Sequence, residues 1–291
     1  MMNRKINAAV FPVAGLGSRF LPATKATPKE MLPIVDKPLI QYAVEEAVDA
    51  GIKKMIFVTG RNKRAIEDHF DTAYELEADL ALKEKHELLD VAQSVAPKGV
   101  EFVYVRQSTA LGLGHAIFCA KPALSNEPFA VLLADDLIRS SIGAVQQLIV
   151  AADETARPII GLEKIQPHQT RAYGVISIRE TMGKHVVASN LVEKPKPEDA
   201  PSNLGVVGRY ILPYEIFDVI AKLPTGSGGE IQLTDALAVL AQRDGVIGVL
   251  LEGQRFDCGS KLGFAQANIE YGMEHPEIGV DLKAYLKALA I

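Results

Sequence analysis

Short apolar runs alternate with helical segments along the first half of the chain, and this alternation is the strongest constraint on the fold. Apolar residues recur at helical spacing from Leu39 to Val48, between two such runs, and Gly51 then marks the end of a helix. Alternation of this kind predicts parallel strands joined by right-handed crossovers, with helices on both faces of the sheet. The runs with strand character are 8–13, 55–59, 102–105 and 129–133.

The second half of the chain is less regular, and strands outnumber helices in it. We expect helices over 230–242 and 261–271. The fold class that follows is α/β: a Rossmann-like, mixed and mostly parallel central sheet flanked by helices, with smaller β elements in the second half. The strands predicted there are 158–162, 174–178, 186–192, 204–212 and 246–251.

Composition narrows the class of protein. The chain has 291 residues, 48% of them hydrophobic, which is enough for one large buried core. Its net charge of -5 argues against a nucleic-acid-binding surface, and no apolar run approaches the length of a membrane span. Cys119 and Cys258 have no metal-ligand spacing, which fits a reducing compartment, and we expect a cytoplasmic protein that binds neither nucleic acid nor membrane.

A glycine-rich loop follows the first predicted strand, where residues 11–20 read FPVAGLGSRF. The dinucleotide fingerprint needs a third glycine at position 20, which is Phe20, and no Gly-Lys-Ser/Thr triplet of a Walker loop is present. An NAD-dependent dehydrogenase is therefore a weak alternative. Glycine backbone groups together with Arg19 and Lys29 suit a polyphosphate, although a surface loop with solvated cations fits this stretch equally well.

Two adjacent aspartates, Asp135 and Asp136, follow the fourth predicted strand. Ligands of open α/β sheets bind beyond the carboxyl ends of the strands, where the glycine loop and residues 107–114 are also expected. A carboxylate at this edge can hold a Mg²⁺ ion that neutralises phosphate charge. Adjacent side chains on an extended chain point in opposite directions, so the two aspartates are expected to have different partners. A simpler interpretation is that Asp136 caps the next helix.

Seven stretches together resemble the sugar-nucleotide pyrophosphorylases and, within that family, the bacterial UTP–glucose-1-phosphate uridylyltransferases. The resemblance spans about residues 8–272, nearly the whole chain. The loop alone marks only the wider family, whereas the stretches after residue 190 are more specific. They read AGLGSRFLPATKATPKEMLP, VDKPLIQYAVEEA, VRQSTALGLGHAI, AYGVI, VEKPKPEDAPSNLGVVGRYIL, GEIQLTDAL and FDCGSKLGFAQANIEYG.

The resemblance implies a reaction and a set of residue roles. The phosphate of glucose 1-phosphate would attack the α-phosphorus of UTP and release pyrophosphate, with Mg²⁺ as the cofactor. The implied catalytic residues are Arg19, Lys29, Lys194 and Asp135. The implied nucleotide contacts are Ala14, Gly15, Gly17, Ser18, Gln107 and Gly112. The implied sugar contacts are Asp136, Gly174, Glu193 and Lys194, and the implied metal ligands are Asp135 and Asp257.

The resemblance also implies one nucleotidyltransferase domain over residues 1–291. About residues 1–140 would bind the nucleotide and about 141–260 the sugar phosphate, while the helices of about 261–291 would form a contact in a homo-oligomer, a dimer or tetramer. Two alternatives remain open. The same chemistry could act on dTTP or another sugar 1-phosphate, such as galactose 1-phosphate, or the protein could be a non-catalytic sensor of nucleotide sugars.

Overall fold

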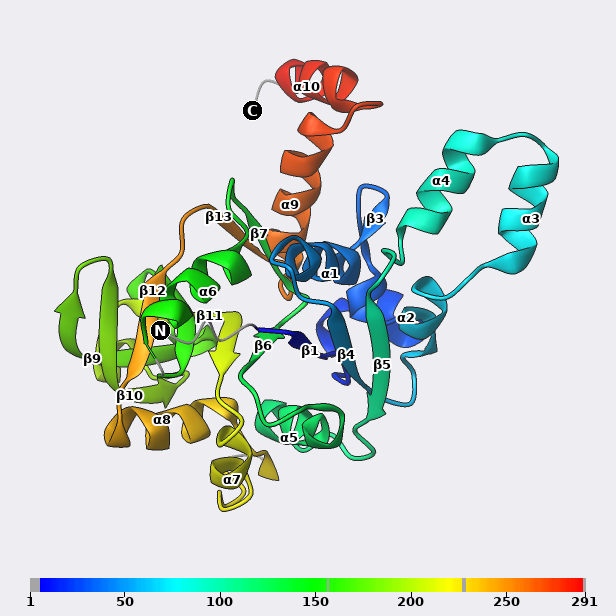
Figure 1. Ribbon diagram of the computed structural model, residues 1–291. Coiled ribbons are helices and arrows are strands. Elements are labelled where there is room, and N and C mark those ends of the chain that lie inside the picture. The colour runs from blue at the N-terminus through cyan, green and yellow to red at the C-terminus, as the bar shows by residue number, and fades with distance from the viewer. Residues whose placement is uncertain (1–5, 156, 227–228, 290–291) are drawn as a thin grey trace.

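A nine-stranded mixed sheet forms the centre of the molecule (Figure 1). The computed structural model describes residues 6–155, 157–226 and 229–289. Every strand predicted from the sequence belongs to this sheet. From one edge to the other its strands are β5 (Glu101–Arg106), β4 (Lys54–Thr59), β1 (Ala8–Pro12), β6 (Phe129–Leu132), β11 (Leu204–Leu212), β8 (Ile159–Lys164), β12 (Val246–Leu250), β10 (His185–Glu193) and β9 (Gly174–Met182).

Strand direction divides the sheet into two parts. β5, β4, β1 and β6 run parallel to one another, as the alternation in the first half predicts. In the second half β8 and β12 are parallel, whereas β11 and β10 run antiparallel to the strands on either side. The mixed α/β fold expected from the sequence is therefore confirmed. The parallel strands β1, β5 and β6 end at one edge, which brings the segments that follow them together.

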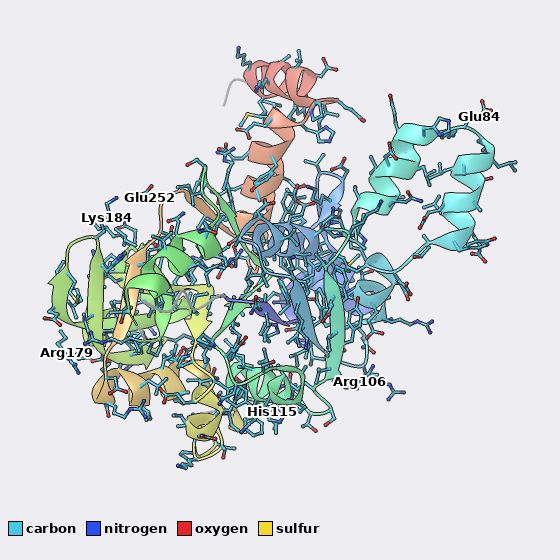
Figure 2. All side chains as sticks on the ribbon, viewed as in Figure 1. Glu84, Arg106, His115, Arg179, Lys184 and Glu252 are labelled. Atoms are coloured by element: carbon cyan, nitrogen blue, oxygen red, sulfur yellow. The ribbon has the colours of Figure 1, made fainter. Side chains whose placement is uncertain are left out.

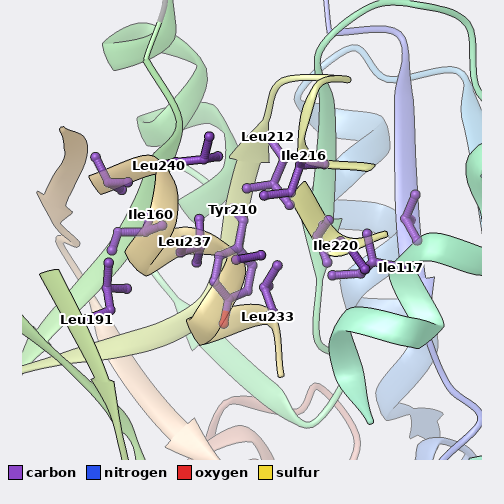
Figure 3. Close-up of a cluster of buried hydrophobic side chains, with 14 of the residues drawn as sticks. Ile117, Ile160, Leu191, Tyr210, Leu212, Ile216, Ile220, Leu233, Leu237 and Leu240 are labelled. Carbon is purple, nitrogen blue, oxygen red and sulfur yellow. The ribbon is translucent and has the colours of Figure 1, made fainter. Parts of the chain in front are cut away.

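Helices cover both faces of the sheet and create two hydrophobic cores. α5, α7 and α8 pack on one face, where Tyr210, Leu233, Leu237 and Leu240 belong to one buried cluster (Figure 3). α1 and α6 pack on the other face around residues such as Val44. The helices are α1 (Leu39–Asp49), α2 (Arg64–His69), α3 (Tyr74–Leu82), α4 (His86–Ser94), α5 (Leu113–Cys119), α6 (Ala144–Glu154), α7 (Ile216–Ile220), α8 (Leu233–Arg243), α9 (Lys261–Glu274) and α10 (Gly279–Ala288).

The segment between β4 and β5 contains three helices, α2, α3 and α4. α3 and α4 form a hairpin that projects from the body, with Glu84 at its tip (Figure 2). Glu84 has a left-handed backbone, with a φ angle of 54°, and this conformation ends one helix before the next begins. α9 and α10 also project from the body (Figure 1). Among the described residues, no helix is both long enough and apolar enough to cross a membrane.

Two short antiparallel pairs lie beside the main sheet, and neither was predicted. β2 (Pro33–Ile34) pairs with β3 (Lys37–Pro38) at the start of α1. β7 (Asp136–Arg139) pairs with β13 (Gln254–Asp257), and the register places Asp136 opposite Asp257. This second pair brings the end of the chain's last strand to the two adjacent aspartates, and it is the element that assembles the site.

Candidate active site

A cavity of about 520 Å³ opens at the edge where β1, β5 and β6 end. It gathers most of the residues predicted from the sequence, which come from segments far apart in the chain. Gly17, Ser18 and Lys29 do not line it. The predicted residues that line it are Ala14, Gly15, Arg19, Gln107, Gly112, Asp135, Asp136, Gly174, Glu193, Lys194 and Asp257.

The glycine loop folds over the end of β1 and is held from below by Thr24. The hydroxyl of Thr24 donates a hydrogen bond to the carbonyl of Gly17 over 2.7 Å, and Thr24 is buried. No described atom lies within 4 Å of the position that a Cβ on Gly15 would take, so this part of the loop faces open space. Arg19 and Ser18 are exposed in a single helical turn, Ser18–Phe20. The loop thus presents backbone and a guanidinium to the cavity.

Asp135 lines the cavity and forms an ion pair with Lys29, which lies beside the cavity without lining it. The Lys29 ammonium lies 2.6 Å from one Asp135 carboxylate oxygen, and about a quarter of each side chain is exposed, 24% and 27%. Burial alone would lower the pKa of Lys29, but the charges of Asp135 and Glu30 outweigh it and raise that pKa. Burial likewise opposes ionisation of Asp135, but the adjacent ammonium holds the pKa of this carboxyl below its ordinary value. Both groups are therefore charged near neutral pH.

Asp135 and Asp257 face a common space above Gly259. A Cβ built on Gly259 would lie 2.9 Å from Oδ2 of Asp135 and 3.0 Å from Oδ1 of Asp257, so only glycine fits there without displacing a carboxylate. Asp257 is held in place by two donors, the Gly259 N–H over 3.0 Å and the Tyr173 hydroxyl over 2.9 Å.

These two carboxylates suit a Mg²⁺ ion. Proteins commonly hold this ion through one or two carboxylates, with substrate phosphates and water completing an all-oxygen shell. Across the described residues no group of three or more His, Cys, Asp and Glu side chains has the arrangement of a metal site. The donor set therefore fits a metal that arrives with a phosphate ligand rather than one in a closed protein cage.

Asp136 has partners different from those of Asp135. Its carboxylate accepts hydrogen bonds from the Gly208 N–H and from Nε of Arg255, each over 2.7 Å, and the residue is 7% exposed. Burial raises the pKa of Asp136, and the Arg255 guanidinium opposes that rise. Asp136 begins β7 rather than capping a helix. Both of its carboxylate oxygens therefore already accept hydrogen bonds from the protein.

Glu193 and Lys194 lie at the end of β10, which has a neighbouring strand on each side and is not an edge strand. The Lys194 ammonium lies 2.9 Å from one Glu193 oxygen, and the Thr234 hydroxyl donates to the other over 2.6 Å. Lys194 has a left-handed backbone, with a φ angle of 47°, and its N–H donates to the Tyr173 carbonyl over 3.1 Å. Gly174 packs against the same Glu193 carboxylate. The half-exposed Lys194 side chain is thereby aimed at the cavity.

The loop after β5 is held by the segment that precedes α8. The Ile231 N–H donates to the Leu111 carbonyl over 2.7 Å, and the Gly114 N–H donates to the Ile231 carbonyl over 2.8 Å. A Cβ on Gly112 would lie 2.7 Å from that carbonyl oxygen, and the φ angle of Gly112 is 96°, so the position requires glycine. Next to this loop the Gln107 amide donates to the Gly112 carbonyl over 3.2 Å. The clamp fixes the wall of the cavity on which Gln107 lies.

Sequence reasoning missed four residues that position the site. Three of them lie inside quoted motifs that drew attention to other positions, namely AGLGSRFLPATKATPKEMLP, AYGVI and GEIQLTDAL, and the fourth lies two positions before Asp257. Residue type alone does not separate such tyrosines, threonines and arginines from ordinary surface residues. The four are Thr24, Tyr173, Thr234 and Arg255.

Comparisons with known proteins agree with this geometry. A family model described as nucleotidyl transferase matches residues 9–273. The chain belongs to the nucleotidyl transferase family. Over 288 residues it is 50% identical to a UTP–glucose-1-phosphate uridylyltransferase of Staphylococcus epidermidis, covering 99% of this chain and 100% of the relative. The resemblance inferred from the motifs is confirmed, and the dehydrogenase alternative is excluded.

Two solved structures extend the similarity to three dimensions. The UTP-bound UGPase from Acinetobacter baumannii matches with a TM-score of 0.90 and 43% identity, covering 97% of this chain and 99% of that one. A UDP-glucose pyrophosphorylase complexed with UDP-glucose matches with a TM-score of 0.86 and 44% identity, covering 93% of this chain and 100% of that one. Members of the family with these names are enzymes, and the fold observed here is theirs.

Proposed function

We propose that this protein makes UDP-glucose and pyrophosphate from UTP and glucose 1-phosphate. The observation that carries the proposal is a cavity lined by Asp135, Asp257 and Lys194, in which Asp135 also pairs with Lys29. The family names and the UTP and UDP-glucose complexes of similar proteins support the choice of substrates.

In the proposed reaction an oxygen of the glucose 1-phosphate phosphate group forms a bond to the α-phosphorus of UTP. The bond from that phosphorus to the β-phosphate oxygen breaks, and pyrophosphate leaves with the electron pair. Such in-line transfer needs little covalent help from the protein, so positioning and charge neutralisation supply most of the rate.

The nucleotide would lie on the glycine loop. Open space over Gly15 supports contact between the base and the backbone of Ala14 and Gly15, with Gln107 and Gly112 on the opposite wall. Arg19 and Lys29 would bind the triphosphate, whose charge replaces the Asp135 carboxylate as the partner of Lys29. Gly17 and Ser18 lie outside the cavity wall, so we assign them to the shape of the loop rather than to direct contact.

Asp135 and Asp257 would hold Mg²⁺, which when bound neutralises charge on the phosphates of UTP. The Tyr173 hydroxyl and the Gly259 N–H keep Asp257 directed at Asp135. A second arginine, Arg255, stacks on the Tyr173 ring with its guanidinium carbon 4.6 Å from the ring centre. This stacking fixes the tyrosine from behind, so the protein supplies a preorganised pair of carboxylates.

The sugar phosphate would lie against β10, where Lys194 pairs with its phosphate and Glu193 accepts hydrogen bonds from glucose hydroxyls beside Gly174. Asp136 was expected to contact the sugar as well. Because both of its oxygens accept bonds from Gly208 and Arg255, we assign it to holding β7 in place.

The test is pyrophosphate release from UTP and glucose 1-phosphate, with and without Mg²⁺, in the wild type and in Asp135→Asn. We expect Mg²⁺-dependent turnover that falls by at least about a hundredfold in the variant, since a ligand and a counter-charge are lost together. Parallel assays with dTTP and with galactose 1-phosphate decide the substrate, and preference for either would overturn the proposed pair. Binding of UDP-glucose without any turnover would show a sensor instead.

The protein is further proposed to be a cytoplasmic homo-oligomer with a single domain. The shared sheet joins the nucleotide part, about 1–140, to the sugar-phosphate part, about 141–260, and two unpaired cysteines fit a reducing compartment. Apolar side chains on α9 and α10 are strongly exposed, including Leu262 at 70% and Val280 at 82%, which supports a contact between copies there. Light scattering of the wild type and of Val280→Glu measures the molar mass of each and so tests this contact. A monomeric wild type would contradict the proposed oligomer.

A further inference from the structure

The side-chain amide of Gln107 is held in one orientation by the protein. Gln107 directly follows β5 and is 7% exposed, and its backbone N–H donates to the carbonyl of Thr59 at the end of β4. Its amide nitrogen lies 3.2 Å from the Gly112 carbonyl oxygen and 2.9 Å from Nδ1 of His115. An amide nitrogen carries two hydrogens and no acceptor, so both of its donors are used by protein acceptors.

This arrangement leaves one kind of polar atom for a ligand. The structure gives the Gln107 oxygen Oε1 no hydrogen-bond donor among the described residues, although Gln107 lines the cavity. The free side of the amide is therefore an acceptor only. The glutamine does not offer the combined donor and acceptor that its residue type allows.

His115 supplies the second of the two acceptors that hold the amide in this orientation. It lies on α5, the helix that begins directly after Gly112 in the loop that follows β5 (Figure 2). Because the amide nitrogen can only donate, Nδ1 of His115 accepts and the ring proton is on Nε2. Were the amide reversed, its oxygen would face the Gly112 carbonyl, which can only accept, and its two hydrogens would lose the acceptors that they now have.

We propose that His115 determines base specificity by locking the Gln107 amide with its oxygen toward the base. The inference rests on the proposed use of UTP. An acceptor at this point matches the N3–H of uracil and opposes the unprotonated N3 of cytosine. Thymine has the same N3–H, so the lock separates imide bases from cytosine without separating UTP from dTTP. His115 is a positioning residue, since it acts on the base through Gln107.

The experiment compares three variants by steady-state kinetics and by calorimetric binding of UTP, dTTP and CTP. His115→Leu removes the acceptor while filling the space. His115→Asn can place its side-chain oxygen where Nδ1 was and so keeps an acceptor. Cys119→Ala is the matched control, since Sγ of Cys119 lies 4.0 Å from both nitrogens of the same imidazole but forms no hydrogen bond with Gln107.

In His115→Leu we expect the UTP-to-CTP ratio of kcat/KM to fall at least about tenfold, because the amide keeps one acceptor, the Gly112 carbonyl, in place of two and turns its hydrogens toward the base more readily. The UTP-to-dTTP ratio should stay at the wild-type value, and the loss should lie in KM and Kd rather than in kcat. His115→Asn should retain most of the discrimination, and Cys119→Ala all of it.

Three results would overturn the inference: an unchanged UTP-to-CTP ratio in His115→Leu, an equal fall in Cys119→Ala, or a fall in His115→Asn as large as that in His115→Leu. Thermal unfolding checks that each variant is folded, and His115→Met replaces the leucine variant if that one is not. A wild type that releases no pyrophosphate from UTP contradicts the proposed function itself, which keeps the two failures distinguishable.

Discussion

Arg209 offers the sharpest test of how this fold holds Asp135, the proposed metal ligand. Its side chain is 1% exposed and donates to both oxygens of Glu46, the shortest bond being 2.7 Å. It also donates to the carbonyls of Leu133 and Asp136, which lie on either side of Asp135, over 3.0 and 2.8 Å. Burial lowers the pKa of Arg209, but the Glu46 carboxylate outweighs it and raises that pKa. The pair is charged in the folded protein.

Replacing Arg209 by methionine keeps an unbranched apolar stem and removes every donor. The Leu133 carbonyl keeps a second donor, the Asp136 N–H, and Glu46 keeps the Val145 N–H. The cost is therefore dominated by an unpaired carboxylate on Glu46, whose side chain is only 11% exposed. Breaking a buried pair in this way costs about 3–5 kcal/mol. For a chain of 291 residues this corresponds to a drop in Tm of roughly 5–8 °C.

Urea and thermal unfolding followed by circular dichroism measure this loss, with Arg243→Met as the control. Arg243 also pairs with a glutamate, Glu215, but is 52% exposed, so its replacement should stay within about 0.5 kcal/mol of the wild type. Adding Glu46→Gln to Arg209→Met removes the stranded charge and should recover at least about 1 kcal/mol. The reasoning is refuted if Arg209→Met is no less stable than Arg243→Met, or if the two changes at 209 and 46 simply add.

Three further predictions concern the site. Lys194→Ala should raise KM for glucose 1-phosphate at least about tenfold with little change in KM for UTP, since a phosphate counter-charge is lost. An equal rise in the two KM values would contradict the assignment of Lys194 to the sugar phosphate. Tyr173→Phe removes the hydroxyl that positions Asp257, so the Mg²⁺ concentration for half-maximal rate at saturating UTP should rise roughly tenfold; an unchanged Mg²⁺ requirement would exclude this role. Because Lys29 lowers the pKa of Asp135 below its unfolded value, their pairing stabilises the fold near neutral pH and loses its effect as pH falls below about 4. The difference in the free energy of unfolding between wild type and Lys29→Met should therefore shrink at acid pH. A difference that stays constant from neutral to acid pH would contradict the pairing.

Periodicity in the sequence determined the core of this protein. The apolar runs at β1, β4, β5 and β6 are bounded by polar or glycine-rich segments, and each became a strand of the main sheet. Parallel strands joined by crossovers must end at one edge, and this rule alone placed the glycine loop, Gln107 and Asp135 together. The loop's own residues indicated phosphate, while the identity of the nucleotide came from family resemblance.

Only the tertiary structure decided which polar groups meet. Lys29 and Asp135 are 106 residues apart, and no local pattern specifies that they pair. Asp257 reaches the site through β7 and β13, two four-residue strands too short to carry an alternating signal. The free energy of hydrophobic burial is roughly proportional to the apolar area removed from water, so the buried positions can be inferred from the spacing of apolar residues along the chain. A hydrogen bond or ion pair depends instead on distances that are set after the elements have packed. The same reason hid the role of His115, which follows from one 2.9 Å contact and from no motif.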